Sequence, residues 1–529
     1  MASRRSVHRT DSDNEAPSES EDLDSVKLLR KHPKKLSKYH VLAFVLTFFS
    51  YALFHATRKT FSNVKVTVSA TWTPMNKSLP SVFDDNWNGH NLFKSQGDTS
   101  VFLGVLDTVF MTSYAIGLFI SGAIGDRLNL KYVLAFGMCS SSLTVFMFGV
   151  VSEWLHLYSK IWYVVFWSLT GLLQSTGWPT VVAVIGNWFG KSSRGFVMGV
   201  WGASPSVGNI VGTCIVNAVL HYGYQYSFLV TSSVTFGFGI IILFSLISSP
   251  RDVGLLGPDE LYSKSPRISL SPDEEPLLKN EISTRSIEST LSVRPKAVGL
   301  CHACCLPGVV AYSFAYACLK FVNYSFFFWL PFYLQMAYGW KEDKADLLSV
   351  WYDVGGIIGG ILIGYLSDKL ESRSPVVGLM LVLSPFSLYI YSEAPADLTK
   401  NAALMTFTGT VIGGVASLIS TAVSADLGRH PELANSKEAL STVTGIIDGT
   451  GSFGAAFGQV LVPIIMKAFG WKSVFYVFIL MTILTLLCII QIVYRDTVAL
   501  FERIYRRIFS VNVDEGLINA ERETTSVNQ

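Results

Sequence analysis

Apolar residues gather into two long blocks, residues 39–248 and 301–494, which are bounded by polar segments. Within each block the apolar runs are about 20 residues long, the length that an α-helix needs to cross the hydrocarbon core of a bilayer. The pattern therefore predicts an all-α membrane protein with twelve transmembrane helices. The runs lie at about 40–61, 100–121, 132–152, 161–183, 196–219, 226–248, 306–335, 348–366, 375–392, 402–424, 440–466 and 472–494.

A basic run precedes the first helix, and arginines follow the last one. Because basic flanks favour the cytosolic side, both termini are predicted to be cytosolic. The expected regions are a disordered cytosolic tail (1–38), a six-helix bundle (39–248), a cytosolic linker loop (249–300), a second six-helix bundle (301–494) and a cytosolic tail (495–529).

This orientation places the segment 62–98 on the lumenal or external side. Asn76-Lys77-Ser78 in that segment is a glycosylation acceptor sequence. The linker loop contains Asp273 followed by Leu277-Leu278, the pattern of an acidic dileucine sorting signal. We therefore expect a multi-pass protein of endomembranes, either the endoplasmic reticulum or the lysosome.

Composition supports a membrane protein and excludes other classes. Hydrophobic residues make up 50% of the chain and charged residues 15%, against roughly 25% charged in soluble domains. The net charge of +2 leaves no basic surface of the size that a nucleic-acid-binding protein needs. Seven cysteines scattered over apolar segments do not form a disulfide framework. Cys301-x2-Cys304-Cys305 lacks the spacing of a four-ligand zinc site. Two interpretations of these cysteines stay open, namely lipidated thiols and inert thiols.

The two apolar blocks repeat one another. Gly122-x3-Asp126-Arg127 follows the second helix, and Gly364-x3-Asp368-Lys369 follows the eighth, 242 residues later. Three glycines of the fifth helix match three of the eleventh at a spacing of 246, namely Gly199, Gly208 and Gly212 with Gly445, Gly454 and Gly458. Matches in one order at nearly constant spacing indicate a duplication, and Asp126 and Arg127 are expected to tie helix ends together on the cytosolic side.

Ionisable residues inside the helices are few, and each costs at least about 2.5 kcal/mol at the bilayer centre, so they mark sites or ion pairs. Arg58 and Lys320 fall in the corresponding first and seventh helices. Two cations facing one cavity make sense if an anion sits between them, and phosphate suits them because arginine binds it bidentately. The alternative is that Arg58 and Lys59 snorkel to the interface. Asp107, Asp353 and Asp448 are interpreted as structural partners rather than proton carriers.

Several motifs carry a family resemblance. The Gly-x3-Asp-Arg sequence resembles the loop motif of the major facilitator superfamily, whose members are built from two six-helix repeats. Tyr51-x6-Arg58-Lys59-x-Phe61 and Gly171-x2-Gln174-x2-Gly177-Trp178-Pro179 resemble the first and fourth helices of organophosphate:phosphate antiporters. Within that group the chain is similar to solute carrier family 37 through the runs 55–65, 125–130 and 320–331.

The resemblance implies exchange of a sugar phosphate, such as glucose 6-phosphate, for inorganic phosphate by alternating access. It makes Arg58 the phosphate-binding arginine, with His55, Lys59, Lys320 and Asn323 as further substrate-binding residues. Two positions depart from the bacterial pattern. Asn323 stands where a second arginine is expected, with Lys320 one turn away, and Pro205 stands at a helix-five histidine.

No catalytic or metal constellation is recognised, so we expect neither enzyme activity nor a cofactor. The expected partners are a small phosphorylated anion, inorganic phosphate and membrane lipid, and no nucleic acid. An accessory membrane protein stays open as a partner. Two rival functions also stay open. The first is a carrier of another phosphate- or phosphonate-like anion with different coupling, and the second is a non-transporting membrane partner subunit.

Overall fold

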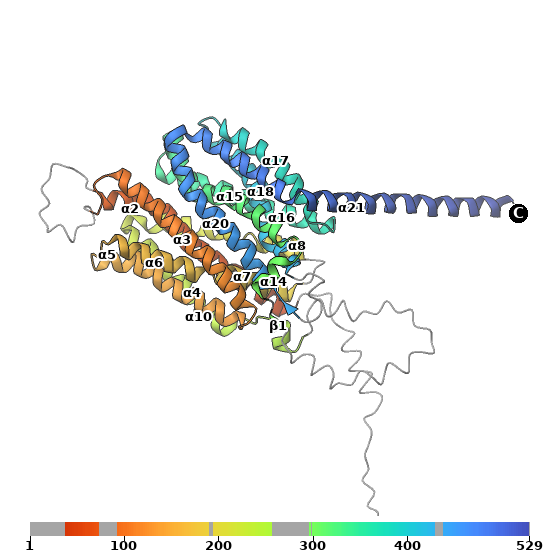
Figure 1. Ribbon diagram of the computed structural model, residues 1–529, viewed down its shortest axis with the longest axis horizontal. Coiled ribbons are helices and arrows are strands. Elements are labelled where there is room, and N and C mark those ends of the chain that lie inside the picture. The colour runs from red at the N-terminus through yellow and green to blue at the C-terminus, as the bar shows by residue number, and fades with distance from the viewer. Residues whose placement is uncertain are drawn as a thin grey trace, which may run out of the picture. The chain divides into compact units, whose positions relative to one another are not determined.

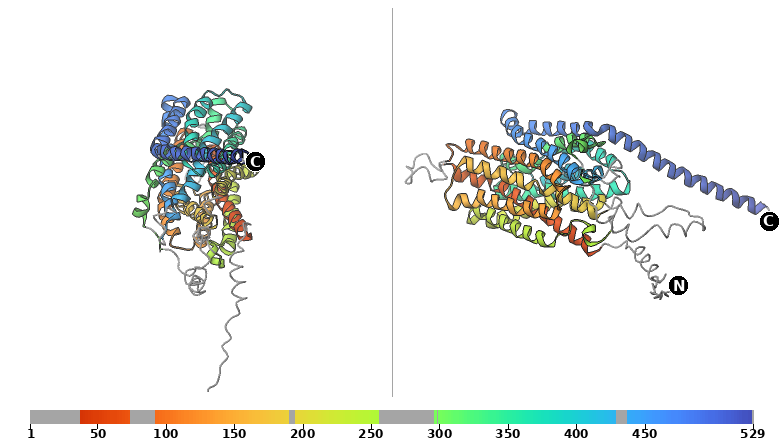
Figure 2. Two further views of the ribbon diagram at one scale, coloured as in Figure 1. Left: turned by 90° about the vertical axis from the view of Figure 1, so that its right-hand side faces the viewer. Right: turned by 60° about the horizontal axis from the view of Figure 1, so that its bottom comes forward.

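The computed structural model describes residues 37–73, 92–189, 194–255, 296–297, 299–428 and 437–527. The chain divides into a short unit, residues 1–41, and a second unit, residues 42–529, to which the description below applies. Helices make up nearly all of the described part of that second unit. They run side by side in one bundle, from which the C-terminal part of the last helix projects (Figure 1, Figure 2).

The first half consists of helices and short helical turns that follow one another along the chain. They are α2 (Lys38–Trp72), α3 (Gln96–Gly125), α4 (Leu130–Phe146), the π-helical turn η2 (Met147–Val151), α5 (Ser152–Trp154), α6 (Lys160–Gln174), α7 (Gly177–Trp188), α8 (Arg194–Trp201), α9 (Ser204–Val219), the 3₁₀ turn η3 (Leu220–Tyr222), α10 (Tyr224–Ser245) and the 3₁₀ turn η4 (Pro250–Val253).

The second half begins with the two-residue strand β1 (Lys296–Ala297), which pairs in parallel with β2 (Lys437–Glu438). Its helices are α14 (Leu300–Cys305), α15 (Val309–Tyr338), α16 (Glu342–Lys369), α17 (Ser374–Ser392), α18 (Leu398–Leu418), the π-helical turn η5 (Ile419–Val423), α19 (Ser424–Leu427), α20 (Leu440–Phe469) and α21 (Trp471–Val527).

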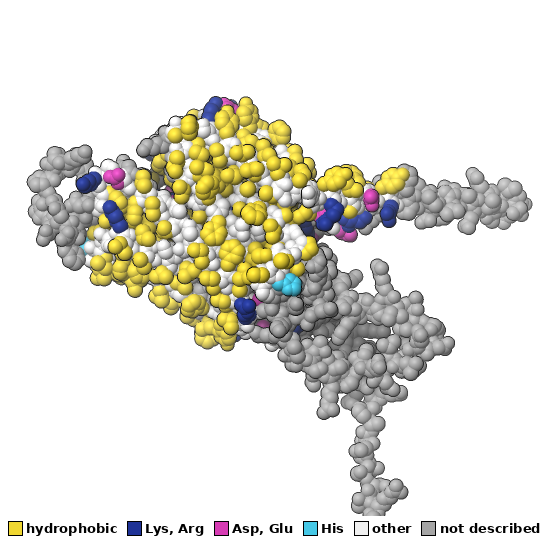
Figure 3. Space-filling view, in the orientation of Figure 1, with side chains coloured by type: hydrophobic (Ala, Val, Ile, Leu, Met, Phe, Trp, Pro, Cys, Tyr) yellow, Lys and Arg dark blue, Asp and Glu magenta, His cyan; other side chains and the backbone are white. Residues whose placement is uncertain are grey.

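Among the described residues, ten helical segments are long and apolar enough to cross a membrane. The α6–α7 pair and α15 occupy two further positions where the sequence predicts a span. The all-α fold with twelve membrane helices is therefore confirmed. Apolar side chains cover the face of the bundle seen in Figure 3, and charged side chains gather near the helix ends, as expected for a protein surrounded by lipid.

Two membrane helices of the first half are interrupted near a proline. Pro205 lies in the first turn of α9, where its missing N–H costs no hydrogen bond, and the preceding helix α8 ends at Trp201. Pro179 lies in the first turn of α7, and α6 ends at Gln174. Both breaks bring polar and aromatic side chains to the middle of the bundle.

The repeated glycines bring the two halves into backbone contact at two equivalent places. A Cβ on Gly445 of α20 would lie 2.5 Å from the carbonyl oxygen of Leu118 and 2.9 Å from Cα of Gly122, both on α3. A Cβ on Gly199 of α8 would lie 2.4 Å from the carbonyl oxygen of Gly360 and 3.3 Å from Cα of Gly364, both on α16. Gly445 thus packs on Gly122 of the loop motif, and Gly199 packs on Gly364, the matching glycine of the second copy.

The first copy of the loop motif caps a helix of the opposite half. Asp126, at the C-terminal end of α3, accepts hydrogen bonds from the backbone N–H groups of Ser441 (2.9 Å) and Thr442 (2.7 Å) in the first turn of α20. A carboxylate at a helix N-terminus satisfies otherwise unpaired N–H groups and is favoured by the helix dipole. Arg127 is exposed, and its Nη1 makes a long hydrogen bond of 3.4 Å to the carbonyl oxygen of Ala123.

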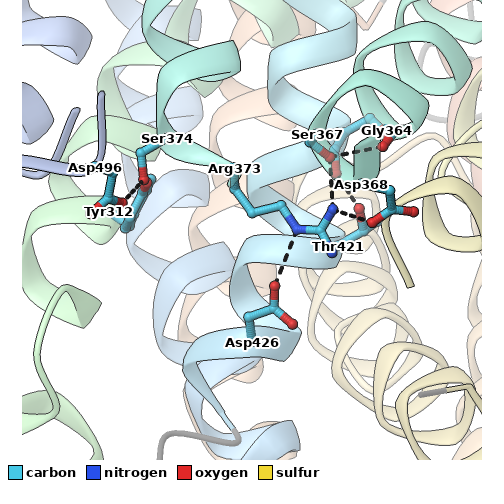
Figure 4. A network of polar contacts seen from close by, with 10 residues as sticks. Tyr312, Gly364, Ser367, Asp368, Arg373, Ser374, Thr421, Asp426 and Asp496 are labelled. Carbon is cyan, nitrogen blue, oxygen red and sulfur yellow. Dashed lines mark hydrogen bonds and ion pairs between the residues drawn. The ribbon is translucent and has the colours of Figure 1, made fainter. Parts of the chain in front are cut away.

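The second copy of the motif takes part in an arginine-centred network (Figure 4). The Nη1 atom of Arg373 donates to Asp368 (2.5 Å) and Ser367 (2.8 Å), and Nε donates to Asp426 at the end of η5–α19 (3.2 Å). Ser367 in turn donates to the carbonyl oxygen of Gly364 (2.8 Å). This network joins the ends of α16, α17 and α19. The exposed Lys369 closes α16.

Candidate functional site

A cavity lies at the junction of the two halves. Its empty volume, with its open mouth included, is about 840 Å³. Aromatic rings and uncharged polar groups form most of its wall, together with one lysine, one histidine and two carboxylates. The lining includes Tyr51, His55, Lys59, Trp178, Asn209, Tyr316, Asn323, Tyr324, Phe327, Tyr352, Asp353 and Asp448.

Arg58 lies on α2, directly behind this wall, and only 1% of it is exposed. Its Nε donates to Oε1 of Gln174 on α6 at 2.7 Å, and its Nη1 lies 3.5 Å from Nε2 of His55. The guanidinium carbon is 4.3 Å from the ring centroid of Tyr114. Among the described residues no carboxylate pairs with Arg58. The Tyr114 hydroxyl interacts with the guanidinium, but the buried Nη2 makes no hydrogen bond of good geometry. Arg58 therefore keeps one donor unused in a site that excludes bulk water.

His55 connects Arg58 with the second half. Its Nδ1 lies 3.1 Å from Oδ1 of Asn209 on α9. The Nδ2 atom of Asn209 donates to Oδ1 of Asp353 on α16 at 2.7 Å. These contacts form a continuous polar chain from a cavity carboxylate to the buried arginine.

Lys59 is the cation that lines the cavity itself. Its Nζ makes a long hydrogen bond of 3.4 Å to the carbonyl oxygen of Phe327 and lies 5.0 Å from the centroid of that ring. Both groups belong to α15 of the second half. The side chain is buried, and it does not snorkel toward an interface as one of the two alternatives proposed.

Lys320 on α15 is buried and already has a counter-ion. Its Nζ donates to Oδ1 of Asp448 at 2.8 Å and to Oγ of Ser452 at 2.8 Å, both on α20. Its Nζ also lies 5.6 Å from the ring centroid of Tyr114, the ring that contacts Arg58. Arg58 and Lys320 thus both contact the ring of Tyr114. Neither of them is among the described residues that line the cavity, whereas Lys59 and His55 are.

Close helix packing shows which residues of the two halves correspond. A Cβ on Gly208 would lie 2.1 Å from the carbonyl oxygen of Ala52, and one on Gly454 would lie 2.1 Å from that of Ala317. Ala52 and Ala317 are 265 residues apart, and the same spacing relates Arg58 to Asn323 and His55 to Lys320. Asn323 therefore stands at the place of Arg58 in the second half. It lines the cavity and accepts a hydrogen bond of 2.8 Å from the hydroxyl of Tyr352.

A second ion pair lies two helical turns from Arg58. Lys65 on α2 pairs with the fully buried Asp107 on α3. The Nζ atom of Lys65 also lies within 6 Å of the ring centroids of Phe61, Phe328 and Trp329. Because Phe328 and Trp329 belong to α15, the cation also bridges the halves, and Asp107 serves as its structural counter-ion.

Several residues singled out in the sequence lie elsewhere. Asn76 and the Asp273, Leu277 and Leu278 triplet fall outside the described residues. Cys301 and Cys305 of α14 are exposed, and burial raises the pKa of the Cys304 thiol between them. Within the described residues no group of three or more His, Cys, Asp or Glu side chains is placed to hold a metal ion.

Sequence reasoning missed Asn209, Tyr114 and the cavity residues Tyr316 and Tyr352 as parts of the site, and it noted Tyr51 and Gln174 only as motif residues. These side chains carry no charge, so the cost of burying a charge does not single them out. The available signal was the placement of amides within apolar helices, because a buried amide requires hydrogen-bond partners.

Comparison with known proteins agrees with this architecture. The family model of the Major Facilitator Superfamily matches residues 47–436. The chain belongs to the major facilitator superfamily. Sugar phosphate exchanger 3 of Bos taurus is 54% identical over 483 residues, which cover 90% of this chain and 97% of that protein. Glucose-6-phosphate exchanger SLC37A2 of Danio rerio is 37% identical over 473 residues, covering 87% and 93%. The resemblance to solute carrier family 37 is therefore confirmed.

A solved structure shows the same fold. The major facilitator proton:xylose symporter XylE, bound to 6-bromo-6-deoxy-D-glucose, aligns with a TM-score of 0.58 at 14% identity and covers 86% of this chain and 96% of that one. As a member of the major facilitator superfamily, the protein is a multi-pass membrane transporter built from two six-helix repeats. The cavity between the repeats is the place where such transporters bind substrate.

Proposed function

We propose that the protein exchanges a phosphorylated sugar, such as glucose 6-phosphate, for inorganic phosphate by alternating access. The observation that carries the proposal is the buried guanidinium of Arg58, which has an unpaired Nη2 and, within the described part of the chain, no carboxylate counter-ion. Burying an uncompensated charge is costly, so a site that retains one suits an anionic ligand. The names of the relatives, which are sugar phosphate exchangers, point to the same class of anion.

In this proposal Arg58 binds the phosphate group, and Lys59 adds a point charge from the cavity wall. Asn323 contributes hydrogen bonds, and His55 lines the site and acts through Arg58, because its two ring nitrogens face Asn209 and Arg58. Tyr51, Trp178 and Tyr324 supply ring faces and hydroxyls for the sugar. Lys320 contributes to binding only if the anion displaces Asp448 from its ammonium, because the two residues form an ion pair in this structure.

The direct test uses purified protein in liposomes loaded with inorganic phosphate. Labelled phosphate and labelled glucose 6-phosphate are added outside, and uptake is compared with liposomes that contain sulfate instead. Uptake that depends on internal phosphate supports exchange. Uptake that is equal with phosphate and with sulfate inside would reject phosphate as the counter-substrate, and no uptake of either label would reject the function.

A second candidate differs in coupling. Two carboxylates, Asp353 and Asp448, line the cavity, and carboxylates within transporters commonly carry protons. In this version the phosphorylated anion, or a phosphonate-like one, moves with protons. The same liposomes separate the two versions, because an imposed pH gradient without internal phosphate drives uptake only under proton coupling.

The remaining assignments concern the membrane and the cell. We infer that both termini are cytosolic, that Asn76 carries a glycan, and that Asp273 with Leu277-Leu278 directs the protein to the lysosome or the endoplasmic reticulum. An accessory membrane protein stays open as a partner. Loss of the glycan in Asn76→Gln and redistribution of Leu277→Ala/Leu278→Ala to the cell surface are the expected results.

A further inference from the structure

The side chain of Asn209 connects the two halves of the transporter at the cavity. It projects from α9 of the first half, where only 5% of the residue is exposed. Its Oδ1 lies 3.1 Å from Nδ1 of His55 on α2, and its Nδ2 lies 2.7 Å from Oδ1 of Asp353 on α16. One amide thus contacts an imidazole of its own half and a carboxylate of the other.

The chemistry of the three groups fixes the direction of these hydrogen bonds. An ionised carboxylate only accepts, so Asn209 must present its NH₂ group to Asp353. The same amide then presents its oxygen, which also only accepts, to His55. The Nδ1 atom of His55 must therefore carry the hydrogen, and Nε2 is left with a lone pair.

That lone pair faces Arg58. Nη1 of Arg58 lies 3.5 Å from Nε2 of His55, and Nε of Arg58 donates to Gln174 at 2.7 Å. Gln174 is held in turn, because its Nε2 donates to Oγ1 of Thr57 at 2.9 Å. Two acceptors on two edges orient the planar guanidinium, and the direction of the unpaired Nη2 follows from them.

We propose that Asn209 is a positioning residue for Arg58, which uses the charge of Asp353 to set the tautomer of His55 and thereby aims the free Nη2 donor. The proposal rests on the proposed role of Arg58 in binding the anion. Because Asp353 lies on the second half, the relay is complete only where α9 and α16 are in contact. Arg58 is therefore aimed by a contact between the halves, and the aim is lost when α9 and α16 separate.

The opposite tautomer of His55 would undo the arrangement. With the hydrogen on Nε2, the imidazole would present a donor to Nη1 of Arg58, which is also a donor, and the guanidinium would lose one of its two acceptors. Asn209→Leu leaves His55 free to adopt either tautomer, because leucine has a similar size and no hydrogen-bonding group.

The chain offers a matched control on the same two helices. Nδ2 of Asn63 on α2 donates to Oγ1 of Thr213 on α9 at 2.9 Å. Thr213→Val removes this hydrogen bond and the one that Oγ1 of Thr213 donates to the backbone carbonyl of Asn209 at 3.0 Å, but it keeps the Asn209 side chain and its contacts with His55 and Asp353. It therefore measures the effect of weakened packing alone.

A swap of acid and amide supplies a rescue. In Asn209→Asp/Asp353→Asn the new carboxylate accepts from Nδ1–H of His55 and from the new amide, so the polarity of the relay is kept. In Asn209→Asp alone two carboxylates face each other, and the relay is broken. A residue that matters only for packing would show no such recovery in the double variant.

The first measurement reads the tautomer and needs no substrate. Nitrogen-15 spectra of histidine-labelled protein distinguish Nδ1–H from Nε2–H, and His55→Gln identifies the His55 signals. Nδ1–H is expected in the wild type, in Thr213→Val and in the swap variant, and its loss is expected in Asn209→Leu. A wild type with Nε2–H, or an unchanged tautomer in Asn209→Leu, would overturn the relay.

The second measurement is phosphate self-exchange in liposomes. Asn209→Leu should raise the KM for phosphate about tenfold, the size of one oriented hydrogen bond to a charged group, with a smaller effect on the maximal rate. Thr213→Val should keep the wild-type KM, and the swap variant should recover most of the loss. A wild-type KM in Asn209→Leu, despite an altered tautomer, would overturn the positioning role. A wild type that exchanges no phosphate rejects the proposed function, while the spectra still decide the relay.

Discussion

Lys320 and Asp448 form a buried ion pair that joins α15 to α20, with Nζ and Oδ1 2.8 Å apart. Both residues are at least 97% buried, so neither charge is screened by water. Ser452 satisfies a second hydrogen of the ammonium group, and the second oxygen of Asp448 has no partner among the described residues. The pair thus combines a strong contact with an unused acceptor in the cavity wall.

Removing one member of this pair should destabilise the protein. Lys320→Ala leaves Asp448 buried and uncompensated, and the loss of folding free energy should be about 3–5 kcal/mol. The expected result is a lower yield of monodisperse protein and a lower melting temperature in detergent. Lys320→Met/Asp448→Asn, which removes both charges, should recover most of the yield.

The opposite outcome would assign Lys320 to the substrate. If Lys320→Ala folds as well as the wild type and binds phosphate more weakly, its partner during transport is the anion and Asp448 only holds it between cycles. Thermal stability and phosphate binding measured on the same preparation separate the two interpretations.

Arg58→Lys should abolish most phosphate exchange while the protein is still expressed. A lysine retains the charge but cannot donate from Nε to Gln174 and from a second nitrogen to the phosphate in one plane. Lys59→Arg is the matched variant at the next position, because it keeps the charge of a residue that already lines the cavity, and it should retain more activity. Near-normal exchange by Arg58→Lys would remove this arginine from the binding site.

The glycine contacts between the halves should tolerate no side chain. Gly445→Ala places a Cβ 2.5 Å from the carbonyl oxygen of Leu118, and a backbone atom cannot move aside cheaply. We expect a cost of about 1–3 kcal/mol and a clear fall in transport. Gly237→Ala is the control, because a Cβ there meets nothing within 4 Å. Equal behaviour of the two variants would contradict the close packing of α3 and α20.

Asp126→Asn should weaken the cap on α20. The amide keeps one acceptor but loses the charge that interacts with the helix N-terminus, a loss of about 0.3–1 kcal/mol. Because Asp126 and α20 belong to different halves, the variant should favour separation of the halves at this end. Faster modification of a cysteine introduced at Ser441 would report it. Arg127→Gln, which removes an exposed side chain, should leave the rate unchanged.

The fold could be predicted from the sequence because the bilayer imposes a simple rule on it. Runs of about 20 apolar residues predict the twelve helices. The positions of the helices were predicted well, but the residues at which they begin and end were predicted poorly. The first helix was expected to end near residue 61, whereas α2 continues to Trp72. Lys59 and Lys65 lowered the apparent hydrophobicity there, but both are held by aromatic rings of α15.

The binding site was predicted only in part, because its geometry depends on contacts between helices that are far apart in the sequence. The ionisable residues within the helices could be found from their insertion cost. Which of the intramembrane carboxylates pairs with Lys320 could not be found in this way, because helix packing brings Asp448 to it. The relay through Asn209 was invisible because an asparagine among small residues gives no charge or periodicity signal.

The unbroken course of α21, from Trp471 to Val527, makes the last membrane helix and the segment after it one stiff rod. At 1.5 Å per residue the part after Arg495 is roughly 50 Å long, so a tilt of about 10° within the membrane would move its far end by about 8 Å. A small tilt of the second half therefore produces a larger displacement at the outer end of this helix. A fluorophore placed near its end would therefore report the opening and closing of the cavity from outside the bilayer.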